Sequence, residues 1–230
     1  RKTKNNPVLV GDAGVGKTAL ALGLAQRIAS GDVPVEMAKM RVLELDLMNV
    51  VAGTRFRGDF EERMNNIIKD IEEDGQVILF IDELHTIMGS GSGIDSTLDA
   101  ANILKPALAR GTLRTVGATT QEEYQKHIEK DAALSRRFAK VMIEEPSVAD
   151  SMAILQGLKA TYEKHHHVQI TDDAVETAVK MAHRYLTSRH LPDSAIDLLD
   201  EAAATVQNKS KHVKSDESGL TAADKALMDG

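Results

Sequence analysis

The 230-residue sequence contains no cysteine, and aromatic residues make up only 3% of it. The lack of cysteine excludes a disulfide framework and thiol chemistry, and it fits a reducing compartment. No apolar run approaches the roughly 18 residues that a membrane-spanning helix needs, and the first residues do not have the pattern of a signal peptide. We therefore expect a cytoplasmic protein without a membrane partner.

Positive charge is also scarce, with 28 Lys and Arg against 35 Asp and Glu and a formal net charge of −7. A chain this acidic is a poor candidate for binding nucleic acid through a broad basic face, so we expect no nucleic-acid partner. The chain opens at Arg1 without a methionine and closes at Gly230 inside a polar stretch. We interpret both ends as cuts in a longer protein.

The first part of the chain alternates between apolar runs typical of strands and amphipathic patterns typical of helices. Strands are expected at about 7–10, 41–46, 77–81, 113–118 and 140–143, and helices at 59–73 and 98–109. Another helix should follow residue 18, with Leu20, Leu22, Leu24, Ala25 and Ile28 on its buried face. Such alternation predicts an α/β layer fold with a mainly parallel sheet.

After Pro146 only helical periods occur, at roughly 148–165, 171–187 and 192–208. We therefore divide the chain into a large α/β nucleotide-binding subdomain (1–145), a small helical subdomain (146–208) and a polar tail (209–230). The tail is rich in Lys, Asp, Ser and Gly, so we expect it to be disordered.

A glycine-rich loop follows the first strand and opens the first helix. Its residues are Gly11, Asp12, Ala13, Gly14, Val15, Gly16, Lys17 and Thr18, which match G-x-x-x-x-G-K-[ST], and Ala19 completes the predicted cofactor-binding stretch. Backbone N–H groups and the helix N-terminus favour a bound phosphate. Lys17 would reach the β- and γ-phosphates, and the Thr18 hydroxyl would ligate Mg²⁺.

Two adjacent carboxylates, Asp82 and Glu83, follow the apolar run 77–81. Alone they could equally be an ordinary acidic loop after a core strand. Paired with the glycine-rich loop they predict a nucleotide site, because strands of such a sheet end at the ligand crevice. Asp82 would hold Mg²⁺, and Glu83 would act as general base on the attacking water. GTPases and kinases remain open on these motifs, although the Asp-Glu pair favours hydrolysis.

Four longer strings carry a family resemblance: Asn5–Gly11, Phe56–Arg63, Asn102–Leu108 and Leu191–Leu198. With them, residues 2–207 resemble the first ATPase domain of Clp-family AAA+ chaperones. The ClpC type is favoured because a short tail follows Gln207, where ClpB would begin a long coiled coil. The resemblance implies the P-loop NTPase AAA+ fold, a three-layer α/β/α parallel sheet followed by a small all-helical lobe.

The resemblance also implies roles for residues that no simple pattern identifies. Thr120, with Thr119 next to it, would hold the attacking water, the role called sensor 1. Arg136 and Arg137 would face the nucleotide of a neighbouring subunit and stabilise phosphoryl transfer in trans. The Leu-Pro-Asp-Ser string lacks the sensor 2 arginine of many AAA+ proteins, as other first Clp domains do.

The adenine side of the site is expected to be incomplete. By resemblance it uses Ile154, Leu158, Pro192 and Ile196, together with an upstream segment that the printed sequence does not include. We therefore expect reduced nucleotide affinity. His165–His167 are consecutive at a helix end, so their side chains diverge, and we do not expect a metal site there.

Clp proteins form hexameric rings that use ATP to thread polypeptides through a central pore. Phe56, flanked by Arg55 and Arg57, occupies the position of the aromatic residue that grips the substrate, and 89–95 resembles the secondary pore loop. Polypeptide clients, a ring protease of the ClpP type and an adaptor are the partners that the resemblance implies. Two alternatives stay open: an AAA+ module that remodels nucleic-acid complexes, and a module that binds nucleotide only to assemble.

Overall fold

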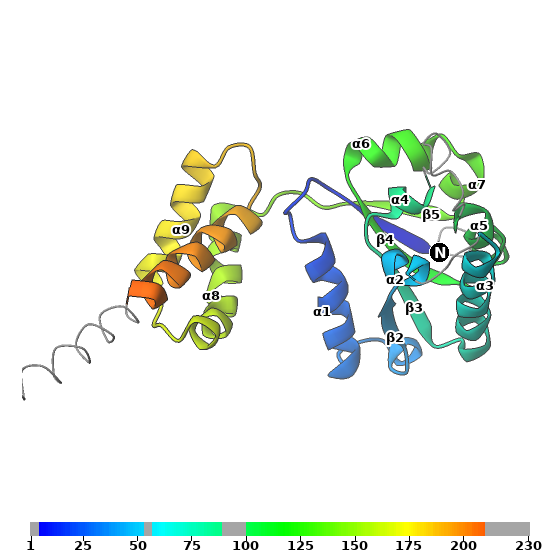
Figure 1. The fold of residues 1–230 in the computed structure, drawn as a ribbon, viewed down its shortest axis with the longest axis horizontal. Coiled ribbons are helices and arrows are strands. Elements are labelled where there is room, and N and C mark those ends of the chain that lie inside the picture. The colour runs from blue at the N-terminus through cyan, green and yellow to red at the C-terminus, as the bar shows by residue number, and fades with distance from the viewer. Residues whose placement is uncertain (1–4, 53–56, 89–99, 210–230) are drawn as a thin grey trace, which may run out of the picture. The chain divides into compact units, whose positions relative to one another are not determined.

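The computed structural model describes residues 5–52, 57–88 and 100–209. It divides the chain into two compact units, one that ends at Glu144 and one that begins at Glu145 (Figure 1). In the described ranges, no helix carries an apolar stretch that could cross a lipid bilayer.

The first unit is built on a parallel sheet of five strands. The strands are β1 (Asn6–Val10), β2 (Arg41–Glu44), β3 (Val77–Ile81), β4 (Arg114–Thr119) and β5 (Phe138–Met142), in the order β2-β3-β4-β1-β5. Every neighbouring pair is parallel, so all five carboxyl ends lie at one edge. β4 lies between β3 and β1, which places the ends of these three strands side by side.

Helices cover both faces of this sheet. The helices described in the first unit are α1 (Lys17–Ala29), α2 (Leu47–Val51), α3 (Arg57–Asp74), α4 (Leu84–Met88), α5 (Ala100–Arg110), α6 (Gln121–Glu123) and α7 (Ala132–Ser135), with a 3₁₀ turn η1 (Val35–Met37) and a π-helical turn η2 (Tyr124–Glu129). Figure 1 shows α1 on one face and α3 with α5 on the other. The three-layer α/β/α fold predicted above is confirmed.

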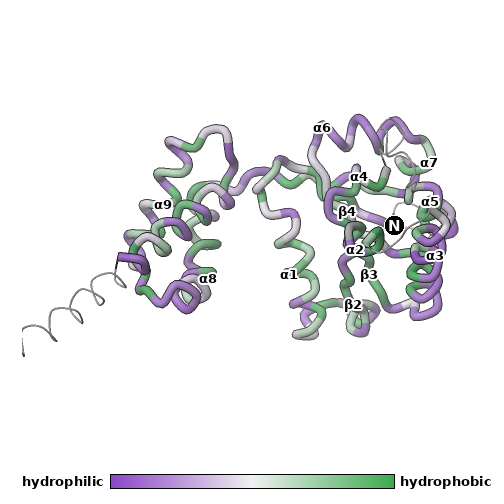
Figure 2. Tube along the Cα trace, in the orientation of Figure 1, coloured by the Kyte–Doolittle hydropathy of each residue, from purple (hydrophilic) through white to green (hydrophobic). Residues whose placement is uncertain are grey.

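The core follows the alternation of side chains along the strands. Val8 and Val10 belong to a cluster with the apolar stripe of α3, including Phe60 and Met64. Leu9, between them, packs on the opposite face in a cluster that includes Ala21 of α1. All five residues of β3 are buried, as expected for a central parallel strand, and Figure 2 shows the apolar colour along it.

One expectation about α1 was wrong. Leu20 and Leu22 are 49% and 62% exposed, although both were assigned to its buried face. The helix lies on the sheet along the positions 21, 24, 25 and 28, of which Ala21 and Ile28 are buried. These positions follow the i, i+3, i+4, i+7 spacing of one narrow stripe, and Leu20 and Leu22 lie on either side of it.

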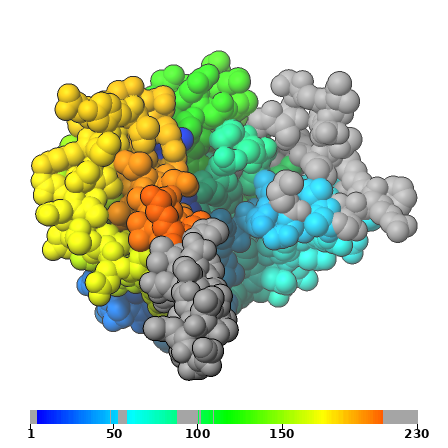
Figure 3. Space-filling model, turned by 60° about the vertical axis from the view of Figure 1, so that its left-hand side comes forward, coloured from blue at the N-terminus to red at the C-terminus, as the bar shows by residue number. Residues whose placement is uncertain are grey.

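In its described residues, 145–209, the second unit has three helices: α8 (Val148–His166), α9 (Asp172–Tyr185) and a third over 193–209. Ser147 and Thr171 cap the first two, since their hydroxyls accept hydrogen bonds from the backbone N–H groups of Asp150 and Ala174. The third helix packs against the other two (Figure 3), with buried Ala195 and Leu199 in the shared core. The predicted small helical lobe has this all-helical structure.

Candidate active site

The glycine-rich loop joins β1 to α1 at the carboxyl edge of the sheet. Gly16 has φ 95° and ψ 23° at the start of α1, a left-handed conformation that glycine adopts without steric cost. Gly11 is needed for a different reason, because a Cβ atom there would lie 2.3 Å from the carbonyl oxygen of Ile143. The loop therefore turns tightly between β1 and α1. Asp12, Ala13 and Ala19 are exposed, and Val15 is buried.

The side chain of Lys17 turns back over this loop. Its ammonium donates to the carbonyl oxygens of Gly11 at 3.0 Å and Asp12 at 2.7 Å. Burial lowers the pKa of Lys17, and the nearby carboxylates of Asp82 and Asp12 act in the opposite direction. The charge of Lys17 thus lies at the mouth of the loop and within electrostatic reach of Asp82.

Thr18 and Asp82 meet at this mouth. The Thr18 hydroxyl donates to Asp82 Oδ2 at 2.7 Å, although the two residues are 64 positions apart. Asp82 is the residue after β3, and its other oxygen, Oδ1, accepts the backbone N–H of Glu83 at 2.8 Å. A hydroxyl and a carboxylate are hard oxygen ligands of the kind that Mg²⁺ takes, so these residues fit that ion.

Glu83 has a strained backbone. Its φ is 46°, in the left-handed region that residues other than Gly, Asn and Asp rarely occupy. Its carbonyl oxygen accepts the N–H of Thr86 at 2.8 Å, and this hydrogen bond closes the first turn of α4. Glu83 itself is exposed. Of the two neighbouring carboxylates, Asp82 thus accepts the Thr18 hydroxyl, while Glu83 is exposed.

The end of β4 lies between the strands that carry these two motifs. Thr119 is the last residue of β4 and is 2% exposed, and its carbonyl oxygen accepts the N–H of Gly11 at 3.3 Å. Thr120 follows and caps α6, because its hydroxyl accepts the N–H of Glu123 at 3.3 Å. Sequence reasoning missed His85, whose Nδ1 lies 3.0 Å from Thr119 Oγ1. Nothing in its spacing distinguished it.

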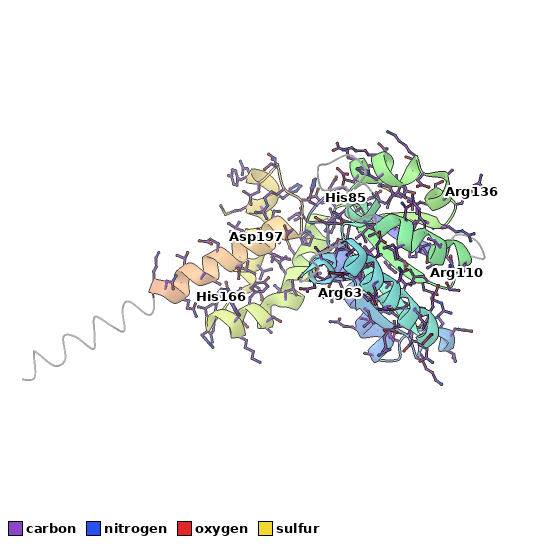
Figure 4. The ribbon with its side chains drawn as sticks, turned by 45° about the vertical axis from the view of Figure 1, so that its right-hand side comes forward. Arg63, His85, Arg110, Arg136, His166 and Asp197 are labelled. Carbon is purple, nitrogen blue, oxygen red and sulfur yellow. The ribbon has the colours of Figure 1, made fainter. Side chains whose placement is uncertain are left out.

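Arg136 and Arg137 follow α7, away from the glycine-rich loop. Figure 1 shows α7 and the start of α1 on opposite sides of the first unit, and in Figure 4 Arg136 lies far from His85. Arg136 is exposed, and Arg137 is half-buried with its N–H bonded to the carbonyl oxygen of Leu134 at 2.9 Å. The structure therefore does not bring Arg136 together with Thr18 and Asp82 of the same chain.

The remaining predicted residues lie elsewhere. Ile154 and Leu158 belong to α8, and Pro192 and Ile196 lie at the start of the third helix of the second unit. Arg55, Phe56 and the loop 89–95 are outside the described residues. Arg57 is the first residue of α3.

The histidine run has other contacts. His166 Nε2 lies 2.5 Å from Asp200 Oδ1, and the ring of His165 meets that of His166 edge-on. Within the part of the chain that the structure describes, no group of three His, Cys, Asp or Glu side chains is placed to hold a metal ion.

Comparisons with known proteins match both units. Residues 7–145 match the family described as "ATPase family associated with various cellular activities (AAA)", and residues 147–228 match an AAA lid domain. The chain is 58% identical over 210 residues to the "ATP-dependent Clp protease ATP-binding subunit ClpC" of Staphylococcus aureus, covering 91% of this chain and 26% of that protein. It is 56% identical, with the same coverage, to "Negative regulator of genetic competence ClpC/MecB" of Bacillus subtilis.

Solved structures agree with the sequence comparisons. The Hsp104–ADP complex of S. cerevisiae is similar with a TM-score of 0.83 and 50% identity, over 92% of this chain and 36% of that one. The extended S. cerevisiae Hsp104:casein complex has a TM-score of 0.82 and 48% identity, over 91% and 36%. The chain thus spans about a quarter of the length of the ClpC relatives that it matches. It belongs to the ATPase family associated with various cellular activities (AAA), and within that family it is related to the Clp-type proteins.

Proposed function

We propose that this chain binds ATP with Mg²⁺ and hydrolyses it as the first motor domain of a Clp-type protein unfoldase. The observation that carries the proposal is the 2.7 Å hydrogen bond from the Thr18 hydroxyl to Asp82 at the mouth of the glycine-rich loop. It joins the two halves of a phosphate and metal site that are far apart in the sequence.

The phosphates of ATP would lie in the loop Gly11–Gly16, against the N-terminus of α1. Backbone N–H groups and the helix dipole favour an anion there. Lys17 would exchange its bonds to two carbonyl oxygens for the β- and γ-phosphates, with its charge already at the loop mouth. Adenine would lie against Ile154, Leu158, Pro192 and Ile196 by resemblance.

Thr18 and Asp82 would hold Mg²⁺ through their oxygens. When bound, the ion neutralises charge on the β- and γ-phosphates. The hydrogen bond between the two side chains keeps both oxygens at the loop mouth before any ligand arrives. The same bond leaves Glu83 as the carboxylate available to a water molecule.

Glu83 would take a proton from the attacking water while the hydroxyl of Thr120, or of Thr119 beside it, orients that water. The water oxygen then bonds to the γ-phosphorus as the bond to the β–γ bridging oxygen breaks, which gives ADP and inorganic phosphate. The proton on Glu83 passes to solvent, which is accessible because the residue is exposed.

Arg136 and Arg137 would complete the site of a neighbouring subunit. Arg136 lies on the other side of its unit from α1, and its side chain is exposed (Figure 4). Guanidinium groups stabilise the charge of phosphoryl transfer and are often supplied in trans. This favours a ring, and by the Clp resemblance a hexamer.

The work of the ring would be to thread polypeptides. Hsp104, about half identical to this chain, has been solved with casein, and ClpC of S. aureus is named as a subunit of an ATP-dependent protease. We accordingly assign to this chain's full-length protein polypeptide clients gripped by Phe56 with Arg55 and Arg57, a ring protease of the ClpP type, an adaptor and a cytoplasmic location.

The decisive experiment measures ATP turnover per protomer over a wide range of protein concentration, with and without Mg²⁺. The Glu83→Gln variant provides the baseline, because it should bind ATP and lose turnover by about 100-fold or more. Specific activity that rises with concentration and needs Mg²⁺ supports the proposal. Turnover equal in wild type and Glu83→Gln would exclude Glu83 as the base, and full turnover by a monomer would exclude the trans arginines.

A further inference from the structure

A network of polar side chains begins in α4, the helix that directly follows the proposed base Glu83. His85, in α4, shares a hydrogen bond of 3.0 Å between its Nδ1 and Thr119 Oγ1. Its ring stacks on that of His127, with centroids 6.5 Å apart and planes at 28°. His127 Nε2 lies 3.0 Å from Glu123 Oε2, and the Glu123 N–H donates to the Thr120 hydroxyl. These contacts therefore link the first turn of α4 to the end of β4.

α4 is docked on β4 at two successive positions of one face. A Cβ atom on Gly117 would lie 2.6 Å from Leu84 Cδ2, so glycine there lets α4 approach the strand closely. Gly117 and Thr119 share that face, because side chains alternate along a strand. Leu84 and His85 thus make one apolar and one polar contact. A helix of five residues depends on such contacts, since its own hydrogen bonds are too few to maintain it.

Glu83 immediately precedes this docked helix. Its left-handed φ of 46° persists only where the surroundings hold it. Asp82 Oδ1 holds the Glu83 N–H on one side. On the other side the chain continues directly into Leu84 and His85, so the docking of α4 constrains the backbone that carries the Glu83 carboxylate.

We propose that His85 is a positioning residue, which holds Glu83 in its active conformation by anchoring α4 to Thr119. The inference rests on the proposed role of Glu83. Thr119 also accepts the Gly11 N–H through its carbonyl oxygen at 3.3 Å, so one residue ties the base, the glycine-rich loop and Thr120 together. Because this role of His85 involves Thr119 and not the phosphates, its loss should change kcat and leave nucleotide binding almost unaffected.

The test compares His85→Leu, which keeps a similar size and loses the hydrogen bond, with His85→Asn, whose amide can replace Nδ1. The matched control is Thr115→Val. Thr115 lies on the same face of β4 and is 1% exposed, but its hydroxyl has no hydrogen-bond partner in the structure. For each protein, kcat and KM for ATP and the Kd for ADP are measured on the whole chain.

We expect His85→Leu to lower kcat about 10- to 100-fold, with KM and the Kd for ADP changed less than about twofold. His85→Asn should restore most of the loss, and Thr115→Val should stay near wild type. Wild-type kcat in His85→Leu, while Glu83→Gln is inactive, would overturn the positioning role and leave the proposed function intact. If His85→Leu and Thr115→Val changed kcat, KM and Kd to the same extent, the positioning role would also be overturned, because such a result indicates general destabilisation.

Amide hydrogen exchange provides a readout that does not depend on turnover. With ADP bound, exchange at Leu84–Met88 should be at least about tenfold faster in His85→Leu than in Thr115→Val, because the helix has lost its polar anchor. Equal exchange in the two variants would contradict the proposal even if the chain had no ATPase activity. The proposed function, by contrast, is tested by ATP turnover and does not depend on this exchange rate.

Discussion

The Thr18 hydroxyl donates a hydrogen bond of 2.7 Å to the carboxylate of Asp82. Thr18 is the second residue of α1, and Asp82 is the first residue after β3. The two elements approach because β4 alone separates β3 from β1, whose end continues into the glycine-rich loop. The contact therefore holds a hydroxyl oxygen and a carboxylate oxygen together at the mouth of the glycine-rich loop.

Replacing Thr18 with Val should weaken Mg²⁺-dependent binding of a slowly hydrolysed ATP analogue about tenfold, or about 1.4 kcal/mol. The reason is the loss of one oxygen ligand, since the side chain keeps its size. Binding of the analogue without Mg²⁺ should change little. Isothermal titration calorimetry with and without the ion measures both. Thr177→Val, the same change at an exposed position of α9, is the control. An equal loss in both conditions would remove Thr18 from the metal site.

Glu83→Gly should be more stable to unfolding than Glu83→Ala by about 1 kcal/mol. At φ 46° alanine keeps the steric clash of a Cβ atom, and glycine has none. At Thr177, inside α9, the order of stability should be reversed, and Thr177→Ala should be more stable than Thr177→Gly by about 1 kcal/mol. Urea denaturation of the four variants gives the comparison. If Ala is also favoured at position 83, the backbone there is not strained.

Arg136→Ala should keep its affinity for nucleotide and lose most of its turnover. Because the arginine would act on a neighbouring site, mixing Arg136→Ala with Lys17→Ala should restore part of the activity. In mixed rings, Lys17→Ala subunits supply arginines to the intact sites of Arg136→Ala subunits. The assay is ATP turnover of each variant and of the mixture, with Arg184→Ala as an exposed control. No recovery on mixing, at concentrations where the wild type is fully active, would argue against action in trans.

Asp131→Asn should lower stability at neutral pH, and its effect should diminish in acid. The side chain of Lys105, at 2.9 Å, lowers the pKa of Asp131, and the N–H groups of Leu134 and Ala133 act in the same direction. A carboxyl whose pKa is lower in the folded state stabilises the fold at neutral pH, and that contribution is lost progressively below about pH 5.

We expect a difference of about 1 kcal/mol between wild type and Asp131→Asn at pH 7, decreasing steadily toward pH 3. Urea denaturation across this range measures it. The control is Asp32→Asn, whose ion pair with Arg27 is exposed at both ends and should contribute little at any pH. A difference for Asp131→Asn that does not depend on pH would mean that its charge does not stabilise the fold.

Local pattern was sufficient to identify several parts of this protein. The apolar run 77–81 is a fully buried strand, and the glycine-rich loop joins a strand to a helix as predicted. Such features depend on neighbouring residues in the chain, through the period of apolar side chains and the conformations open to glycine. For the same reason the three helices of the second unit lie within a few residues of their predicted ranges.

Other features depend on which elements meet in space. The exposure of Leu20 and Leu22 follows from the narrow stripe that α1 presents to the sheet. The left-handed backbone of Glu83 and the hydrogen bond between His85 and Thr119 occur where α4 lies close against β4. A sequence specifies the chemistry of each residue and the likeness to a family, but the partner of a side chain is decided by the tertiary packing that brings distant segments into contact.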